Sequence, residues 1–270
     1  MKPYLNYTGL WKERLGIAYL DPAPDRQRVI VLLHGLGADA ESWVFQYPVL
    51  IAAGFRPLAP DLPGFGRSAA YAQRWSVKRT AEKLAAWLAA LGVERFSLVG
   101  HSMGGAVAQE LALICAERVE KLVLVNTFAH LRIRFSGETR YLTRRFVTLN
   151  FRGLDQQAAQ VAERVFPRED QTIWRELVVE KILQASPRVY RQAMLSLAVF
   201  DARRKAKKLS MPALVVTSEE DTTIAPSIQT ELASRLPNAR QVRIEQSGHA
   251  VLIDQAEEFN RTLLTFLRER

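Results

Sequence analysis

Ser102 is the side chain in this sequence that is best placed to act as a nucleophile. It lies between Gly100 and Gly104, at the point where the apolar run 96–99 gives way to a helix-like run. Glycines on either side allow the sharp reversal from strand to helix that lifts a serine clear of a sheet. The helix would direct its N-terminus, with the N–H of Met103, toward an oxyanion at the same spot. The pattern also occurs in ordinary turns, so its interpretation depends on the rest of the chain.

A serine nucleophile needs a base to take its proton and a carboxylate to orient that base. His249 follows a glycine in a loop after the last expected strand and is the candidate base; the other histidines are His34, His101 and His130. Asp221 follows the buried run 213–217 by a short loop and is the candidate acid, with Glu219 and Glu220 as rivals. Both candidates lie where the carboxyl ends of parallel strands gather. The chain order is then Ser, Asp, His.

The stretch His34-Gly35-Leu36-Gly37 offers a second hydrogen-bond donor. It follows the β-branched and aliphatic run 29–33, which is typical of a strand covered on both faces. Turn chemistry alone would explain the glycines, but the pairing with the Ser102 turn favours the N–H of Leu36 as the second group that holds an oxyanion. We also expect Phe128 and Ala250 to line the substrate pocket.

Two further residues invite a catalytic interpretation, and we interpret both as structural. Asp61 opens the proline and glycine loop 61–68 but precedes Ser102 in the chain, so we expect it to tie that loop together, with Arg67 as one candidate partner. Cys115 is the only cysteine in the sequence and lies in the apolar run after Ser102. It cannot form an internal disulfide, and we expect a small core residue.

The elements that must position these groups alternate between strand and helix. Apolar runs indicate strands at 15–20, 29–33, 57–60, 96–99, 121–126, 213–217 and 241–244. Periodic runs indicate helices at 76–91, 106–113, 228–236 and 256–268. Ser76 is the expected N-cap of the first of these helices, Gly92 is its stop, and a strand pair is expected near the N-terminus. The alternation predicts an α/β fold with a doubly wound, mostly parallel sheet.

The pattern changes between Thr127 and Ser210. This segment has helical spacing, frequent arginines and breaks at Gly153, Pro167 and Pro187. We therefore expect a mostly helical cap at 127–210, inserted between the two parts of the core, 1–126 and 211–270.

Length and composition fit one large domain with an insertion. The chain has 270 residues, of which 48% are hydrophobic. No apolar run approaches the roughly 20 residues that a membrane helix needs, so no membrane partner is expected. Charges interrupt residues 1–19, which lack the sustained apolar core of a secretory signal. With a single cysteine, these features favour a cytoplasmic location.

The net charge of +9 arises from one segment. Residues 127–210 carry 17 Lys and Arg against 8 Asp and Glu, and the rest of the chain is balanced. The remainder shows no basic arm, RNA-binding signature or zinc-ligand spacing, so we do not expect nucleic acid as a partner. The positive segment is either a solvated helical surface or a means of steering an acidic or carrier-bound acyl substrate.

These motifs together resemble the α/β-hydrolase family over nearly the whole chain. The stretches that carry the resemblance are His34-Gly35-Leu36-Gly37, Asp61-Leu62-Pro63-Gly64-Phe65-Gly66-Arg67-Ser68, Gly100-His101-Ser102-Met103-Gly104-Gly105, Asp221 and Ser247-Gly248-His249. The resemblance implies an eight-stranded sheet with one antiparallel strand, a cap over the pocket, and serine-dependent acyl transfer without a cofactor or metal. Ser218 departs from the glycine that relatives often have there, and Asn126 stands where some relatives place the acid.

The resemblance leads us to expect a serine hydrolase that cleaves a carboxylic ester or a lactone, a small-molecule substrate. A nucleophilic serine argues against the dehalogenase and epoxide-hydrolase branches, which use aspartate at that position. Hydrolysis of a carbon–carbon bond and perhydrolysis remain open on the same three residues. A different class is also open, because some relatives of this fold are receptors or scaffolds with slow or absent turnover.

Overall fold

The computed structural model describes residues 10–70, 73–131 and 153–269, and these residues form an eight-stranded sheet. The strand order is β1-β2-β4-β3-β5-β6-β7-β8. The strands are β1 (Trp11–Arg14), β2 (Ile17–Leu20), β3 (Arg28–Leu33), β4 (Phe55–Pro60), β5 (Phe96–His101), β6 (Val119–Val125), β7 (Ala213–Ser218) and β8 (Ala239–Ile244). Only β2 runs antiparallel to its neighbours within this described sheet. The predicted doubly wound, mostly parallel architecture is confirmed.

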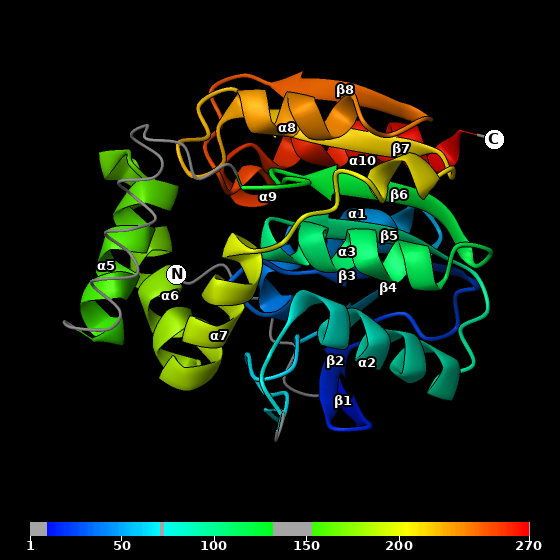
Figure 1. Cartoon of the computed structure of the whole chain (residues 1–270), viewed down its shortest axis with the longest axis horizontal. Helices are drawn as coiled ribbons and strands as arrows, with labels where there is room; N and C mark the ends of the chain where they lie inside the picture. The colour runs from blue at the N-terminus through cyan, green and yellow to red at the C-terminus, as the bar shows by residue number, and fades with distance from the viewer. Residues whose placement is uncertain (1–9, 71–72, 132–152, 270) are drawn as a thin grey trace.

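Both faces of the sheet are covered, which explains why its central strands are apolar throughout. In β3, Val31 and Leu33 contribute to one core cluster, and Ile30 and Leu32 contribute to the other. The first cluster lies under α2 (Val77–Ala90), α3 (Met103–Ile114) and α8 (Pro226–Ala233). The second lies under α1 (Tyr47–Ala52), α9 (Val251–Asp254) and α10 (Ala256–Arg268). Figure 1 shows the two sets of helices on opposite sides of the sheet.

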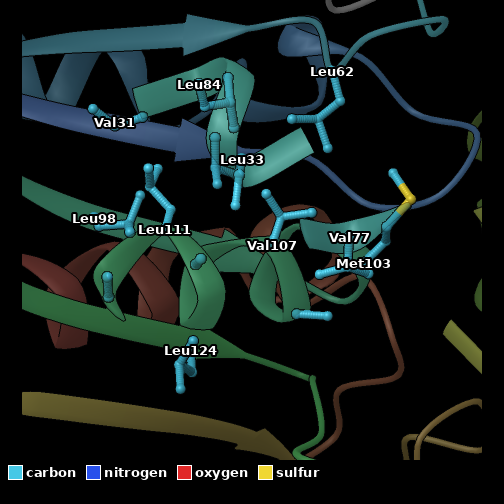
Figure 2. Packing of buried hydrophobic residues seen from close by; sticks show 14 of the residues in the cluster. Val31, Leu33, Leu62, Val77, Leu84, Leu98, Met103, Val107, Leu111 and Leu124 are labelled. Atoms are coloured by element: carbon cyan, nitrogen blue, oxygen red, sulfur yellow. The ribbon is translucent and has the colours of Figure 1, made fainter. Parts of the chain in front are cut away.

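Helix α3 is packed most deeply, in agreement with its apolar sequence. Ten of its residues are buried, from Met103 to Ala112. Figure 2 shows Val107 and Leu111 of this helix pointing into the cluster that contains Leu98 and Leu124 of the sheet. Helix α3, which begins directly after Ser102, is therefore held against the sheet along most of its length.

The N-terminal strand pair differs from the prediction at its start. The run 15–20 is not one strand, because Leu15 and Gly16 adopt positive φ angles of 55° and 70° and form a tight turn. Strand β1 ends before that turn and β2 begins after it, and the two pair antiparallel. Consecutive positive φ angles are what a two-residue hairpin requires, and the preceding strand was too polar to predict.

Between β6 and β7 most of the described residues are helical. The helices are α5 (Leu154–Val165), α6 (Thr172–Gln184) and α7 (Pro187–Ala198), with short 3₁₀ turns at Glu169–Gln171 and Ala206–Lys208. In Figure 1 these three helices lie together beyond the ends of the strands. Part of the predicted cap, 132–152, lies outside the described residues, and we retain the division into cap and core as a proposal.

Candidate active site

Ser102 lies on the sharp turn between β5 and α3. Its backbone has φ 52° and ψ −116°, a conformation that non-glycine residues rarely adopt. A Cβ on Gly100 would lie 2.4 Å from the carbonyl oxygen of Gly104, and a Cβ on Gly104 would lie 2.2 Å from that of Leu33. The two glycines are therefore required by backbone contact, as the sequence predicts. The hydroxyl of Ser102 lines a cavity.

The structure brings Ser102, His249 and Asp221 together. Nε2 of His249 lies 2.9 Å from Oγ of Ser102, and Nδ1 of His249 lies 2.8 Å from Oδ2 of Asp221. Because a carboxylate only accepts, Nδ1 carries the ring proton and Nε2 is the acceptor for the serine hydroxyl. Both His249 and Asp221 are buried. The arrangement provides a base with a free lone pair directed at the hydroxyl.

The rivals of Asp221 are exposed, and its own carboxylate is fully occupied. Oδ1 accepts the backbone N–H groups of Thr223 and Ile224 at 2.8 and 2.9 Å. Oδ2 accepts Nε2 of Gln229 at 3.0 Å in addition to the histidine. These donors fix the orientation of the carboxylate. Both glutamates, Glu219 and Glu220, lie at the surface.

The backbone of His249 is fixed by two side chains that the sequence analysis did not assign to the site. Its carbonyl oxygen accepts Nε2–H of His101 at 2.8 Å and Nδ2–H of Asn126 at 2.9 Å. Burial, followed by the neighbouring His249, lowers the pKa of His101 to about 3, so this ring is neutral. In the sequence, the available signal for Asn126 was its position as a polar residue directly after an apolar strand, because buried polar groups need hydrogen-bond partners.

Relatives often have glycine where this chain has Ser218, and the hydrogen bonds of the Ser218 hydroxyl give the serine a structural role here. Its hydroxyl accepts Nδ2–H of Asn126 at 2.8 Å and lies 3.1 Å from the hydroxyl of Ser247. Asp254 accepts from the Ser247 hydroxyl and from the N–H of Gly248, both at 2.8 Å. The loop that carries the histidine is thus hydrogen-bonded on both sides. A glycine at 218 would remove one of these links.

Leu36 lines the same cavity as Ser102, and Met103 directly follows Ser102 in the chain. Met103 begins α3, so its N–H has no partner within the helix. No hydrogen bond of the Leu36 N–H is found among the described residues. The preceding His34 accepts the N–H of Leu62 at Nε2 and donates from Nδ1 to Gly35, both at 2.8 Å. Burial lowers the pKa of His34 to about 4, so it remains neutral and holds this loop in place.

A cavity of about 220 Å³ opens beside Ser102 and His249. Phe128 and Ala250 both line it, where the sequence analysis expected them. Most of its wall is apolar, with contributions from the core and from the helices between β6 and β7; these include Val161, Phe166, Trp174, Leu177, Met194 and Leu197. The cavity therefore suits an apolar group attached to a reactive carbonyl.

Asp61 has the structural position predicted for it, and Arg67 is a partner through its backbone N–H and not through its guanidinium. Its carboxylate accepts the backbone N–H groups of Ala40 and Arg67 at 2.8 and 2.7 Å. The guanidinium of Arg67 lies instead 3.5 Å from Glu41. Burial and the nearby carboxylate of Asp39 raise the pKa of Asp61 to about 7. The loop 61–68 is tied by main-chain donors, because the Arg67 side chain is half exposed and directed elsewhere.

Comparison with known proteins identifies the family of this chain. The model described as "Alpha/beta hydrolase family" matches residues 30–262. The acetyltransferase component of the acetoin cleaving system of Pseudomonas putida is 32% identical over 247 residues, which cover 89% of this chain but 63% of that protein. The protein named "Putative carbamate hydrolase RutD" from Caulobacter sp. (strain K31) is 31% identical over 260 residues, which cover 91% of this chain and 92% of that protein.

Among solved structures, the enol-lactonase from Burkholderia xenovorans LB400 superposes with a TM-score of 0.85 at 25% sequence identity. The match covers 96% of this chain and 100% of that chain. The sequence match extends over most of the chain, and the structural match includes the eight-stranded sheet. The chain therefore belongs to the alpha/beta hydrolase family.

Proposed function

We propose that this protein is a serine hydrolase that cleaves a carboxylic ester or a lactone through an acyl-enzyme. The observation that carries the proposal is the chain of two hydrogen bonds, 2.9 Å from Ser102 to His249 and 2.8 Å from His249 to Asp221. A relative and a structural neighbour named carbamate hydrolase and enol-lactonase add support. Carbamates, lactones and esters all present a carbonyl carbon to a nucleophile.

In the first half of the proposed reaction, Ser102 attacks the carbonyl carbon while His249 takes the hydroxyl proton at Nε2. The imidazolium that forms is stabilised by Asp221, which also keeps the proton of Nδ1 in place. The N–H groups of Leu36 and Met103 hold the oxyanion of the tetrahedral intermediate. His249 then gives its proton to the leaving alcohol, and the acyl group remains on Ser102.

In the second half, His249 takes a proton from water, which attacks the acyl-enzyme by the same route. Collapse of this second intermediate returns the proton to Ser102 and releases the acid. Residues 127–210, as a cap, would exclude bulk water from the cavity and keep its apolar wall against the acyl group.

Replacing Ser102 by alanine tests the proposal directly. With p-nitrophenyl butyrate as substrate, Ser102→Ala should lower kcat by roughly 10⁴ to 10⁶, because the nucleophile is lost while binding is retained. Ser234→Ala is the matched control, since Ser234 is exposed at the end of α8 and should leave turnover unchanged. Near-normal turnover in Ser102→Ala would exclude this mechanism. A single stoichiometric release of p-nitrophenol by the wild type, without turnover, would favour a receptor of the same fold.

A further inference from the structure

The apolar cavity contains one charged cluster, formed by Lys181, Asp39 and Glu41. All three line the cavity, and Nζ of Lys181 lies 2.6 Å from Oδ2 of Asp39 and 2.6 Å from Oε2 of Glu41. Within the part of the chain that the structure describes, no other Lys or Arg lines this cavity. Among the described residues, this cluster therefore supplies the Lys, Arg, Asp and Glu side chains that an entering substrate meets at the cavity wall.

The cluster is shielded from water and its members are strongly paired. The side chains of Asp39, Lys181 and Glu41 are 3%, 17% and 18% exposed. Burial lowers the pKa of Lys181, but the two carboxylates outweigh burial, and its pKa lies above the ordinary value. Glu41 also lies 3.5 Å from the guanidinium of Arg67, which does not line the cavity, so the two carboxylates balance the charges of both cations.

The three side chains come from two different parts of the molecule. Lys181 lies on α6, whereas Asp39 and Glu41 follow the loop that carries Leu36, at the 3₁₀ turn Ala40–Trp43. Asp39 also accepts the N–H of Glu41 at 3.0 Å and caps that turn. The carboxylates are thus held by the core, and Lys181 is brought to them from the proposed cap.

An anionic substrate would be poorly received by this arrangement. A carboxylate that enters an apolar cavity loses its hydration, and only a well-placed cation can offset that cost. Lys181 already contacts two carboxylates, and these would also repel the newcomer. Within the described stretches 127–131 and 153–210, Lys181 is the one basic residue at the cavity wall, and it is already paired.

We propose that Asp39 and Glu41 neutralise Lys181 and thereby restrict the site to substrates whose acyl part is uncharged. The proposal rests on the proposed function and names its substrate class: apolar, uncharged esters or lactones. It makes Lys181, Asp39 and Glu41 the residues that determine specificity for charge, and it replaces the expectation of an acidic substrate. Lys181 is then a carboxylate-binding group that its neighbours keep occupied.

Two esters of equal backbone length test the proposal: p-nitrophenyl butyrate, which is neutral, and mono-p-nitrophenyl succinate, which ends in a carboxylate. The wild type should prefer butyrate in kcat/KM by roughly tenfold or more, because Lys181 is occupied by Asp39 and Glu41 and does not offset desolvation of the anion. Glu41→Gln and Asp39→Asn preserve shape, and Asn at 39 retains the cap. Each should shift the preference toward succinate by roughly fivefold to tenfold, the effect of one net charge at a partly buried site.

Lys181→Met is the control with the opposite sign. It removes the cation and leaves both carboxylates, so the preference for butyrate should rise rather than fall. Equal preference in the wild type and in Glu41→Gln would overturn the proposal, as would a wild type that favours succinate.

Binding separates a failure of this inference from a failure of the proposed function. Trp174 lines the cavity, and nitrophenyl esters quench tryptophan fluorescence, so both esters can be titrated against Ser102→Ala with and without Glu41→Gln. If neither ester is turned over by the wild type, the hydrolase proposal fails, and the ratio of the two dissociation constants still tests charge selection. A ratio near one in Ser102→Ala, unchanged by Glu41→Gln, would refute charge selection even with esterase activity intact.

Discussion

Asn126 shows how much of the site depends on residues that do not react. It adopts a positive φ of 46°, and its Nδ2 lies 2.8 Å from Oγ of Ser218, 2.9 Å from the carbonyl oxygen of His249 and 3.2 Å from that of Gly248. Its Oδ1 accepts the N–H of Ser218 at 3.0 Å. One amide therefore joins the ends of β6 and β7 to the loop that carries the histidine.

Asn126→Gly should test this role, because glycine accepts the positive φ and removes only the side chain. We expect kcat to fall by roughly tenfold or more with a smaller change in KM, since the histidine loses one of its two anchors. Four buried groups lose a partner, and each one left without any hydrogen bond should cost about 1–3 kcal/mol in the free energy of unfolding. Gln246→Gly is the control, with a positive φ of 52° at an exposed side chain. An unchanged kcat in Asn126→Gly would remove Asn126 from the positioning network.

His34 predicts a pH dependence of stability. Its pKa is about 4 in the folded protein against 6.5 ordinarily, because burial disfavours the charged ring and Nε2 already accepts the N–H of Leu62. Between these values the unfolded chain binds the proton and the folded chain does not, so stability falls as pH falls from 6.5 to about 4.

The slope of the unfolding free energy for this one group should approach about 1.4 kcal/mol per pH unit in that window. His101 adds a similar contribution, since its pKa is lowered in the same direction. Urea unfolding at several pH values, compared between wild type and His34→Gln, measures the difference. Between pH 4 and 6.5, His34→Gln should take up close to one proton fewer on unfolding than the wild type. Identical pH slopes of the unfolding free energy would contradict the assignment of His34 as buried and neutral.

At the scale of elements, helices α6 and α7 rest directly on loops of the core. A Cβ on Gly37 would lie 2.6 Å from Cγ1 of Ile182 on α6 and 3.0 Å from Tyr190 on α7. A Cβ on Gly64 would lie 2.7 Å from Val189 on α7. The loop that carries Leu36 thus has its shape set partly by the helices above it.

Gly37→Ala should separate the contact with the helices from backbone strain. Gly54 is the matched control, because it also has a positive φ, 83° against 77°, and a Cβ there would meet nothing within 4 Å. Gly54→Ala should cost only the left-handed strain, about 1–2 kcal/mol in unfolding free energy. Gly37→Ala should cost more and should also lower kcat/KM, because the loop or α6 must shift.

A second substitution tests why Gly37→Ala should lose more unfolding free energy than Gly54→Ala. Ile182→Ala removes the contacted atoms, so a double-mutant cycle should recover part of the loss seen in Gly37→Ala. An equal loss of unfolding free energy in Gly37→Ala and Gly54→Ala would show that α6 and α7 move to accommodate the new Cβ without a measurable loss of stability.

At the scale of the whole molecule, local sequence patterns were sufficient to predict a mostly parallel sheet and to identify the family. Apolar runs such as 29–33 and 213–217 predict buried parallel strands, and the residues that follow them converge at the carboxyl ends. Ser102, Asp221 and His249 meet for that reason. Among the described residues, no helix is long and apolar enough to cross a bilayer.

The parts that sequence reasoning missed depend on tertiary placement. Asn126 and His101 matter because their polar atoms meet the carbonyl of His249, more than 100 residues away. The pairing of Lys181 with Asp39 and Glu41 depends on where α6 lies over the core, which no local pattern encodes. The count of basic residues in 127–210 left a solvated surface and the steering of an acidic substrate both open, whereas the contacts of Lys181 are an argument against an acidic substrate.

The 147 residues that separate Ser102 from His249 also order events during synthesis. A nascent chain that has been translated only as far as the end of α7 has its nucleophile, yet neither base nor acid has been synthesised. Strands β7 and β8 are added at one edge of a sheet whose centre already exists, so the last segments to emerge complete the proposed reaction centre. Release of p-nitrophenol in a synchronised cell-free translation would then act as a clock for completion of the fold.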